Sequence, residues 1–556
     1  MDMFDYVIVG GGSAASVLAN RITEAGSSVC VLEAGPVDRN PFIRVPAGFV
    51  KTLHNPAITW RFDTEGTDWT AGRAIATTQG RTLGGSSSVN GMVFVRGQAQ
   101  DYESWVSRGC AGWGYADVLP YFKSIERRVG SADEGYRGRD GELPVTDPTW
   151  QHPLCEAFIA GAQSLGMPRN NDYNGASAEG VGYYQRVIEG ERRVSAARAF
   201  LYPAMKRKNL NVKTRSRATS ILLEGNRAVG VRYLVEGSDI SQEVRARREV
   251  IIAAGTINTP KLLQLSGIGP AALLQSLGIE VKHALQGVGE NLSDHYSPRL
   301  VVRVKNSGTI NGLVRGPNLL HQGAKWLMGQ PSVLGLSAAL VYAFGRSDAK
   351  QDKPDYTVIF TPASYKAGKL GSLDNYPGVT AGAWQQRPES VGHVRIRSAN
   401  SAELPVIQPN YLDKENDRTV LLAAIRAARK ILATPSLAMY YGNEELPGAA
   451  SISDAELIEF SRNYGTSCYH LVGTCRMGPA SDPTAVVDEN LCVRGIENLR
   501  IVDASVMPTV TSGNTYAPTL MIAAKAADMI LGRPAKPRIE IAPAGSLRAV
   551  ADSVAC

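Results

Sequence analysis

Cysteine is scarce and irregularly spaced in this chain. The seven cysteines among 556 residues form no Cys-x-x-Cys pair, and their number is odd. Neither a zinc site nor a disulfide framework is indicated by such spacing. We therefore predict no metal site.

Long apolar runs and a cleavable leader are also missing. The longest apolar candidate, Leu334 to Phe344, is interrupted by glycine and serine and is too short to span a bilayer. The first residues lead directly into an apolar run, which leaves no room for a signal peptide. We expect a cytoplasmic protein without a transmembrane segment, and peripheral contact with a membrane stays open.

A large excess of charge is absent as well. The formal net charge is +7, which is small for this length. The densest basic run, Arg245 to Arg248, precedes an apolar stretch and is typical of the solvated start of a strand. Nucleic acid is therefore not an expected partner. With 44% hydrophobic and 20% charged residues, the chain has a globular composition, and its length favours two or more domains.

The chain begins with an alternation of strand and helix patterns. An apolar run from Tyr6 to Val9 is followed by three glycines, a helical pattern and a second apolar run from Val29 to Leu32. This order predicts a β-α-β unit within an open α/β sheet. Further strands are predicted at 211–213, 221–223, 230–235 and 250–253, and a helix at 268–278 with Pro270 in its first turn.

The glycines after the first strand form a dinucleotide fingerprint. In Gly10-x-Gly12-x-x-Ala15, the first glycine permits a tight turn and the second lets backbone approach a pyrophosphate. Glu33 closes the second strand, where an acidic side chain can accept hydrogen bonds from ribose hydroxyls. The fingerprint predicts a dinucleotide, but it does not distinguish FAD from NAD.

A second glycine-rich segment runs from Gly84 to Gly91. It combines backbone amides with three serine hydroxyls, a composition that suits a pyrophosphate or the edge of an isoalloxazine. The alternative, a flexible linker, is weakened by the apolar run that follows from Met92 to Val95.

Six ordered motifs resemble those of the glucose-methanol-choline (GMC) oxidoreductases along nearly the whole chain. They are the N-terminal fingerprint, 84–90, 254–269, 287–295, 469–474 and 502–518. The resemblance implies an α/β fold, α+β overall, with a Rossmann-like FAD-binding domain and a separate sheet-and-helix substrate-binding domain. The boundaries we expect are 1–298 for the first part of the FAD domain, 299–465 for the substrate domain and 466–536 for the completing C-terminal part. A tail, 537–556, is expected to be poorly ordered.

The resemblance also implies which residues hold a noncovalent FAD. Some relatives attach FAD through a histidine in the glycine/serine loop, and Val89 occupies that position here, so a covalent link through it is not expected. The predicted cofactor-binding residues are Gly10, Gly12, Ser13, Ala14, Glu33, Ala34, Gly84, Ser87, Asn90, Gly91, Val93, Ala254, Asp503, Ala504, Tyr516 and Pro518.

Two catalytic candidates follow from the same resemblance. His470 is expected to face the flavin, because an imidazole with a pKa of about 6.5 can take the hydroxyl proton of an alcohol. Tyr516 stands where we expect relatives to carry His or Asn. A phenol can donate a hydrogen bond to an alkoxide but is a poor base, so Tyr516 either assists catalysis or only fills the pocket wall. His295 is interpreted as a structural partner of Asp294.

The function implied is FAD-dependent oxidation of an alcohol, favoured by analogy to be primary, to an aldehyde or ketone. The hydride would pass to flavin N5 and the proton to His470. Electrons would then leave to dioxygen or to a quinone-type acceptor, with a dehydrogenase preferred. The alternatives are a lyase of the same fold that keeps FAD without net oxidation, and a noncatalytic nucleotide-binding module.

Overall fold

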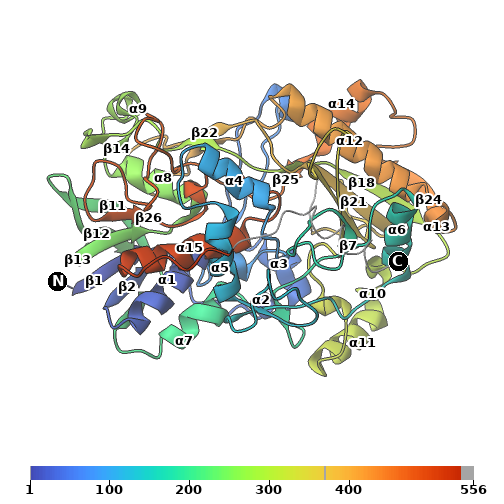
Figure 1. The fold of residues 1–556 in the computed structure, drawn as a ribbon, viewed down its shortest axis with the longest axis horizontal. Helices are drawn as coiled ribbons and strands as arrows, with labels where there is room; N and C mark the ends of the chain where they lie inside the picture. Colours follow the sequence, from blue (N-terminus) through green and yellow to red (C-terminus); the bar gives the residue numbers. More distant parts are fainter. Residues whose placement is uncertain (1, 368–370, 540–556) are drawn as a thin grey trace, which may run out of the picture.

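Two β-sheets lie at opposite ends of the molecule. The computed structural model describes residues 2–367 and 371–539. In Figure 1 a sheet built around the N-terminal strand lies on the left and a second sheet lies on the right. The mixed α/β class predicted from the sequence is confirmed.

The first sheet has a parallel core with an antiparallel hairpin at one edge. Its order is β10-β2-β1-β13-β12-β11, and β26 also pairs with β13. The strands are β1 (Asp2–Val9), β2 (Val29–Leu32), β10 (Leu210–Lys213), β11 (Ser216–Glu224), β12 (Arg227–Val235), β13 (Ser241–Ile252) and β26 (Leu499–Ile501). The β-α-β unit predicted at the N-terminus is confirmed, with α1 (Ser13–Glu24) between β1 and β2.

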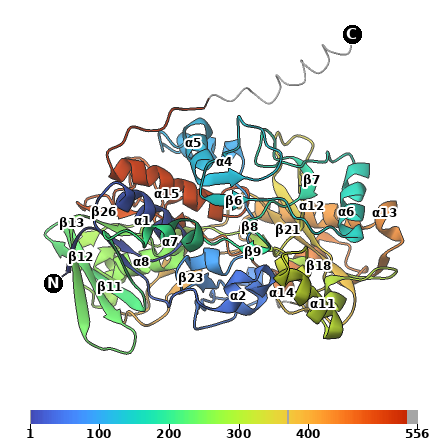
Figure 2. The same ribbon diagram turned by 90° about the horizontal axis from the view of Figure 1, so that it is seen from below.

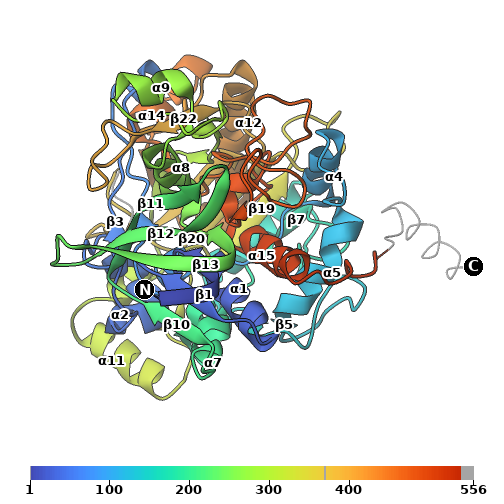
Figure 3. The ribbon, with the colours of Figure 1, turned by 90° about the vertical axis from the view of Figure 1, so that its left-hand side faces the viewer.

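Both ends of the chain build this first unit. β26 pairs in parallel with β13, where Val250 lies opposite Leu499. Helix α15 (Tyr516–Ile530) packs against α1, and Figures 2 and 3 show the two helices side by side. The C-terminal segment therefore completes the hydrophobic core that begins with β1.

The basic run lies inside a strand and not before it. Residues 245–248 belong to β13. Arg245 pairs with Glu224 at 2.7 Å and Arg247 with Asp5 at 3.5 Å, while Arg248 lies over the ring of Tyr6. Two of the three arginines in the run are therefore paired with carboxylates.

The helix predicted at 268–278 is divided. Residues Ile268–Gly269 form β14, and helix α9 begins only at Ala271 and ends at Ser276. Pro270 is the N-cap of α9 and not a residue of its first turn, because the two residues before it pair with β15 (His283–Ala284).

The second sheet is antiparallel and has two different faces. Its order is β24-β18-β21-β20-β19-β7. The strands are β7 (Gly180–Tyr183), β18 (Arg299–Val304), β19 (Val341–Gly345), β20 (Tyr356–Thr361), β21 (Gly378–Gln385) and β24 (Tyr441–Leu446). One face packs on α12 (Glu415–Leu432) and α6 (Pro153–Ser164). Strand β7 and helix α6, which packs on this sheet, both come from the segment 1–298 that we predicted for the FAD domain. The domain boundaries at 298 and 465 stay a prediction.

Two short antiparallel contacts join the segments at the centre of the molecule. β17 (Tyr296–Ser297) pairs with β25 (Thr466–Ser467), and an isolated bridge joins Ser293 to Val472. The segment 293–299 therefore runs alongside 466–472. This pairing places His295 near His470.

The remaining helices of more than one turn surround the two sheets. They are α4 (Ala99–Ser107), α5 (Tyr115–Ile125), α8 (Gly255–Leu265), α11 (Gly316–Leu327) and α14 (Asp454–Tyr464). No helix within 2–367 and 371–539 has the length and apolarity needed to cross a lipid bilayer. Most of the predicted tail, residues 540–556, lies outside the described residues.

Candidate active site

One large cavity lies between the two sheets. Its wall contains His470 and every predicted cofactor-binding residue except Gly84 and Pro518. Gly84 stands behind the wall, where its N–H donates to the carbonyl of Gly11 at 2.8 Å. Pro518 is buried in α15. The sequence motifs therefore converge on one site from three distant parts of the chain.

The dinucleotide fingerprint forms the turn between β1 and α1. Gly10 has φ +99°, and a Cβ there would lie 2.4 Å from the carbonyl oxygen of Ala253. A Cβ on Gly12 would have no protein atom closer than 3.9 Å, because this glycine faces the cavity at the N-terminus of α1. Free backbone N–H groups and the helix dipole at such an end favour a phosphate.

Glu33 is buried at the end of β2 and holds the fingerprint turn. Its two carboxylate oxygens accept from the N–H of Gly11 at 2.7 Å and of Gly35 at 2.8 Å. Burial raises the pKa of Glu33 to about 7 despite these bonds. A carboxylate has about four acceptor positions, so the side chain can still accept from a ribose hydroxyl.

Asp503 joins the C-terminal segment to α8. Its carboxylate accepts from the N–H of Gly255 at 2.9 Å, the hydroxyl of Thr259 at 2.6 Å and the N–H of Ser505 at 2.8 Å. Its neighbour Ala504 lines the cavity. Asp503 therefore fixes the position of α8, whose first residues also line the cavity.

The glycine/serine loop is an ordered short helix, 85–88. The hydroxyl of Ser87 donates to the carbonyl of Gly84 at 2.6 Å and accepts from the N–H of Ala196 at 2.9 Å. The buried guanidinium of Arg193 donates to Asn90 Oδ1 at 2.8 Å, and burial lowers its pKa to about 9. Sequence reasoning missed Arg193, because no motif surrounds it.

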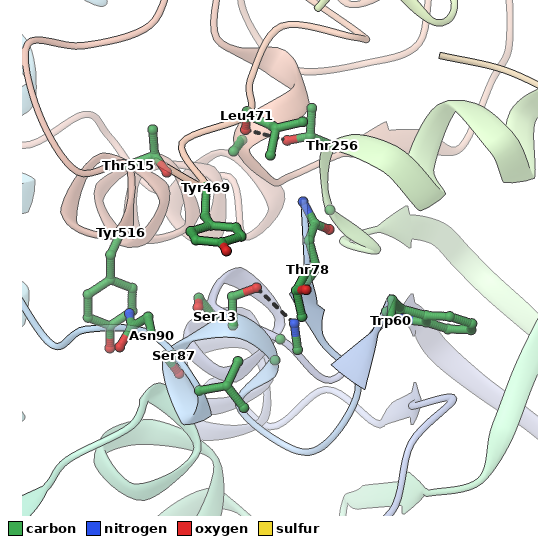
Figure 4. A pocket seen from close by; sticks show the side chains of 18 of the residues that line it. Ser13, Trp60, Thr78, Ser87, Asn90, Thr256, Tyr469, Leu471, Thr515 and Tyr516 are labelled. Carbon is green, nitrogen blue, oxygen red and sulfur yellow. Dashed lines mark hydrogen bonds between the residues drawn. The ribbon is translucent and has the colours of Figure 1, made fainter. Parts of the chain in front are cut away.

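Tyr516 begins α15 and points toward Ser87 and Asn90 (Figure 4). Its hydroxyl is buried, and no described residue meets the geometry of a hydrogen bond to it. Burial raises the pKa of Tyr516, and the neighbouring Ser87 side chain opposes that rise. A buried hydroxyl without a partner is costly. Together with the α1 N-terminus and the open space at Gly12, this hydroxyl at the cavity wall fits a bound dinucleotide such as FAD.

His470 is held on three sides. Its backbone N–H donates to Asp294 Oδ1 at 2.7 Å. Its ring Nδ1 lies 2.9 Å from Nδ1 of His295, and its Nε2 lies 2.8 Å from Nδ2 of Asn514. The next residue, Leu471, accepts a 2.8 Å bond from Thr256 on α8 (Figure 4). The imidazole is therefore fixed to both halves of the molecule.

The contacts of His295 determine which nitrogen of His470 carries a proton. Nε2 of His295 lies 2.8 Å from the carbonyl oxygen of Gln386, which can only accept, so this nitrogen carries the proton. Nδ1 of neutral His295 must then accept from Nδ1–H of His470. Nε2 of His470 is left as the basic atom, and Asn514 donates to it.

The electrostatics keep both imidazoles neutral. Burial lowers the pKa of His295 to about 4. Burial, with His295 as a smaller cause, lowers the pKa of His470 well below its usual value. Beneath them burial raises the pKa of Asp294 to about 6, although Ser467 and Tyr411 each donate to it at 2.6 Å. A neutral His470 can accept a proton.

Two expectations change with this geometry. The interpretation of His295 as a partner of Asp294 is wrong for its ring, which contacts His470 and Gln386. The side chain beside His470 Nε2 is Asn514, two residues before Tyr516. Sequence reasoning missed Asn514, although it lies in the same Gly-Asn-Thr motif, because the spacing within a turn does not reveal which side chain enters a cavity.

The wall beyond His470 comes from the second sheet. Alternate residues of β20 and β21 face the cavity, namely Ile359, Thr361, Thr380 and Trp384. Their neighbours on the opposite face, such as Phe360 and Ala381, belong to the core under α12. This end therefore presents apolar, aromatic and hydroxyl groups to a substrate.

Comparisons with known proteins agree with this geometry. Two family models described as GMC oxidoreductase match residues 4–297 and 388–523. An oxygen-dependent choline dehydrogenase of Brucella anthropi is 41% identical, over 95% of this chain and 96% of that protein. An alcohol dehydrogenase [acceptor] of Pseudomonas putida is 39% identical over the same shares. The crystal structure of pyridoxine 4-oxidase from Mesorbium loti superposes with a TM-score of 0.85 at 33% identity, covering 96% of this chain and 100% of that one.

Proposed function

Because the chain belongs to the GMC oxidoreductase family, whose members depend on FAD, we propose that it oxidises an alcohol to an aldehyde or ketone with His470 as the base. The choline and alcohol dehydrogenases among its relatives support an alcohol as the substrate. A primary alcohol is proposed by analogy with them.

The observation that carries the proposal is the neutral, oriented imidazole of His470. Its Nε2 lies 2.8 Å from Nδ2 of Asn514, and both side chains line the cavity. A substrate hydroxyl beside both side chains would take the place of the amide at Nε2 and give its proton to His470, while Asn514 would donate to the alkoxide oxygen. Loss of that proton makes the carbinol carbon a better hydride donor.

FAD, when bound, supplies the hydride acceptor at its N5 atom. The residues that would hold its pyrophosphate are Gly12 and Ser13 at the start of α1. Glu33 would accept hydrogen bonds from the ribose hydroxyls, and the hydroxyl of Tyr516 would donate a hydrogen bond to the cofactor. We propose noncovalent binding, because Val89 offers no nucleophile at the loop.

The electron acceptor is proposed to be dioxygen or a quinone-type compound, with the dehydrogenase preferred. The names of the relatives include both an oxygen-dependent enzyme and an acceptor-dependent one. Steady-state turnover with air alone and with an added quinone under nitrogen would separate the two acceptors.

The central experiment mixes the purified yellow protein with alcohols in the absence of oxygen. Aliphatic, benzylic and polyol substrates should include at least one that bleaches the flavin absorbance. Acid precipitation should release all of the flavin into the supernatant. A protein that binds FAD but is bleached by no alcohol would contradict the oxidation and favour a lyase, and one that cannot take up FAD would favour a noncatalytic module.

A further inference from the structure

We propose that Arg299 binds a carboxylate group of the substrate, so that the alcohol oxidised here is a hydroxycarboxylate. This inference rests on the proposed function, because it concerns the same cavity. It assigns a chemical group and a binding residue to the end of the substrate that does not react.

Arg299 begins β18 on the face of the second sheet that lines the cavity. It lies opposite Gly382 of β21, which in turn lies opposite Ile359 of β20. Ile359 and Arg299 both line the cavity, and Gly382 between them has no side chain. The side chain of Ile359 occupies the space over Gly382, so this row of the sheet presents a guanidinium beside an apolar side chain to the cavity.

The guanidinium has no acidic partner. Within the described residues no carboxylate lies within 4.0 Å of Arg299, whereas Arg303 on the same strand pairs with Glu445 at 2.6 Å. Among the described residues, the hydrogen bond of the Arg299 side chain runs to the hydroxyl of Thr466. A guanidinium has five N–H donors, so most of its capacity stays available to a bound anion.

The charge acts on groups that surround the cavity. Burial raises the pKa values of Tyr365, Cys468 and Tyr469 to about 12, and Arg299 opposes that rise at all three. All three residues line the cavity with Arg299. The cation is therefore directed at the space around the segment that carries His470.

Acidic groups are missing from this end of the cavity. The acidic residues of the described cavity wall are Glu33 and Asp503, and both accept backbone N–H groups beside the fingerprint and α8. A quaternary ammonium would thus meet a guanidinium and no carboxylate. Although relatives are named choline dehydrogenases, the electrostatics here oppose a cationic alcohol.

A carboxylate fits better than a phosphate. The other Arg and Lys residues of the wall, Arg217 and Lys261, belong to the first sheet and to α8 and both contact Ser401. A single guanidinium matches one carboxylate in a two-pronged contact, whereas a dianionic phosphate would keep one charge uncompensated.

The chain segments set the distance between the two ends of the substrate. Thr466, which contacts Arg299, lies four residues before His470 on one segment, and four extended residues span at most ~13 Å. This span sets an upper limit on the distance between the carboxylate and the carbon that loses the hydride, and a six-carbon ω-hydroxyalkanoate lies within it.

The test compares alcohols that differ only at the remote end. Anaerobic stopped-flow reduction of the flavin is measured with 6-hydroxyhexanoate, its methyl ester and 6-amino-1-hexanol, and 6-hydroxyhexyl phosphate serves as the dianion. We expect the limiting rate divided by Kd to be roughly 10–100-fold higher for the carboxylate than for the ester, and lowest for the amine. A preference for the phosphate over the carboxylate would overturn the assignment of the anion.

The variant Arg299→Gln should remove the preference, so that the ratio of the carboxylate's limiting rate divided by Kd to that of the methyl ester falls to about one. Arg303→Gln, four residues along the same strand, is the matched control and should keep the preference. Binding of hexanoate, followed by the shift it causes in the oxidised flavin spectrum, should weaken by a similar factor in Arg299→Gln without any turnover.

Two outcomes separate this inference from the proposed function. If the ester and other neutral alcohols bleach the flavin and 6-hydroxyhexanoate is no better, the carboxylate site is wrong and alcohol oxidation stands. If no alcohol of any charge bleaches the flavin while hexanoate binding depends on Arg299, the anion site stands and the proposed oxidation is wrong.

Discussion

The Nδ1 atoms of His295 and His470 lie 2.9 Å apart, with the two rings nearly perpendicular at 87°. One of these nitrogens must donate and the other accept. Because the carbonyl of Gln386 receives the second N–H of His295, the donor is His470. A backbone carbonyl thus fixes the tautomer of the proposed base through an intervening histidine.

His470→Ala should lower the rate of flavin reduction by roughly 10²–10⁴-fold, because no other histidine of the described residues lines the cavity. The bound flavin should remain, since the contacts proposed for FAD lie elsewhere in the cavity. Rapid-mixing reduction and the flavin-to-protein absorbance ratio measure the two quantities. Near-normal reduction would exclude His470 as the base.

His295 should act as a positioning residue. His295→Phe leaves Nδ1–H of His470 without an acceptor, and we expect roughly 10–100-fold slower reduction with a changed pH profile. His295→Asn keeps a donor and an acceptor and should recover part of the rate. The exposed His321 on α11 provides the control variant His321→Phe. Equal losses in Phe and Asn variants, with an unchanged pH profile, would point to packing alone.

The pH dependence of reduction should reflect the lowered pKa of His470. Protonation removes its ability to accept a proton, and burial disfavours the protonated ring, so activity should be constant from pH 6.5 to 8 and fall only at lower pH. Asp294, with a pKa of about 6, would lose charge in the same range and weaken its bond to the His470 backbone. A midpoint at or above pH 7 in the rate-versus-pH curve would contradict this electrostatic account.

Asn514 and Tyr516 should separate catalysis from cofactor binding. Asn514→Ala removes the donor beside His470 Nε2 and should slow reduction by roughly 10²-fold. Tyr516→Phe should leave the rate within about twofold, because its hydroxyl faces the glycine/serine loop, and should weaken FAD binding roughly threefold to tenfold. Titration of the apoprotein with FAD gives the second value. A large rate loss in Tyr516→Phe would instead place the phenol in the reaction.

Much of the first unit could be predicted because its signals are local. The fingerprint from Gly10 to Ala15 lies between two apolar runs, so one short segment indicates the strand, the turn and the helix together. The acid Glu33 follows at the expected spacing. The residues that form the fingerprint in the sequence are thus the same residues that form the turn between β1 and α1 in the structure.

The catalytic pair could be predicted only in part, because its geometry is non-local. His470 stands in a recognisable motif, but its contact with His295 depends on two segments 175 residues apart that meet through β17 and β25. Whether Asn514 or Tyr516 contacts Nε2 of His470 depends on the direction in which the chain enters α15. Arg299 carries no motif, and its importance follows from the register of β18 against β21.

Gly10 and Gly12 should fail in different ways when each is replaced by alanine. In Gly10→Ala the new Cβ would lie 2.4 Å from the Ala253 carbonyl at a φ of +99°, so the backbone must shift and the free energy of unfolding should fall by about 2 kcal/mol or more. In Gly12→Ala the Cβ has no protein atom closer than 3.9 Å and would enter the space proposed for the pyrophosphate. Thermal unfolding of the two apoproteins should show a lower melting temperature for Gly10→Ala alone, and FAD titration should show weakened binding for Gly12→Ala despite its normal stability. An apoprotein of Gly12→Ala that binds FAD as tightly as wild type would mean that the cofactor phosphate lies elsewhere in the cavity.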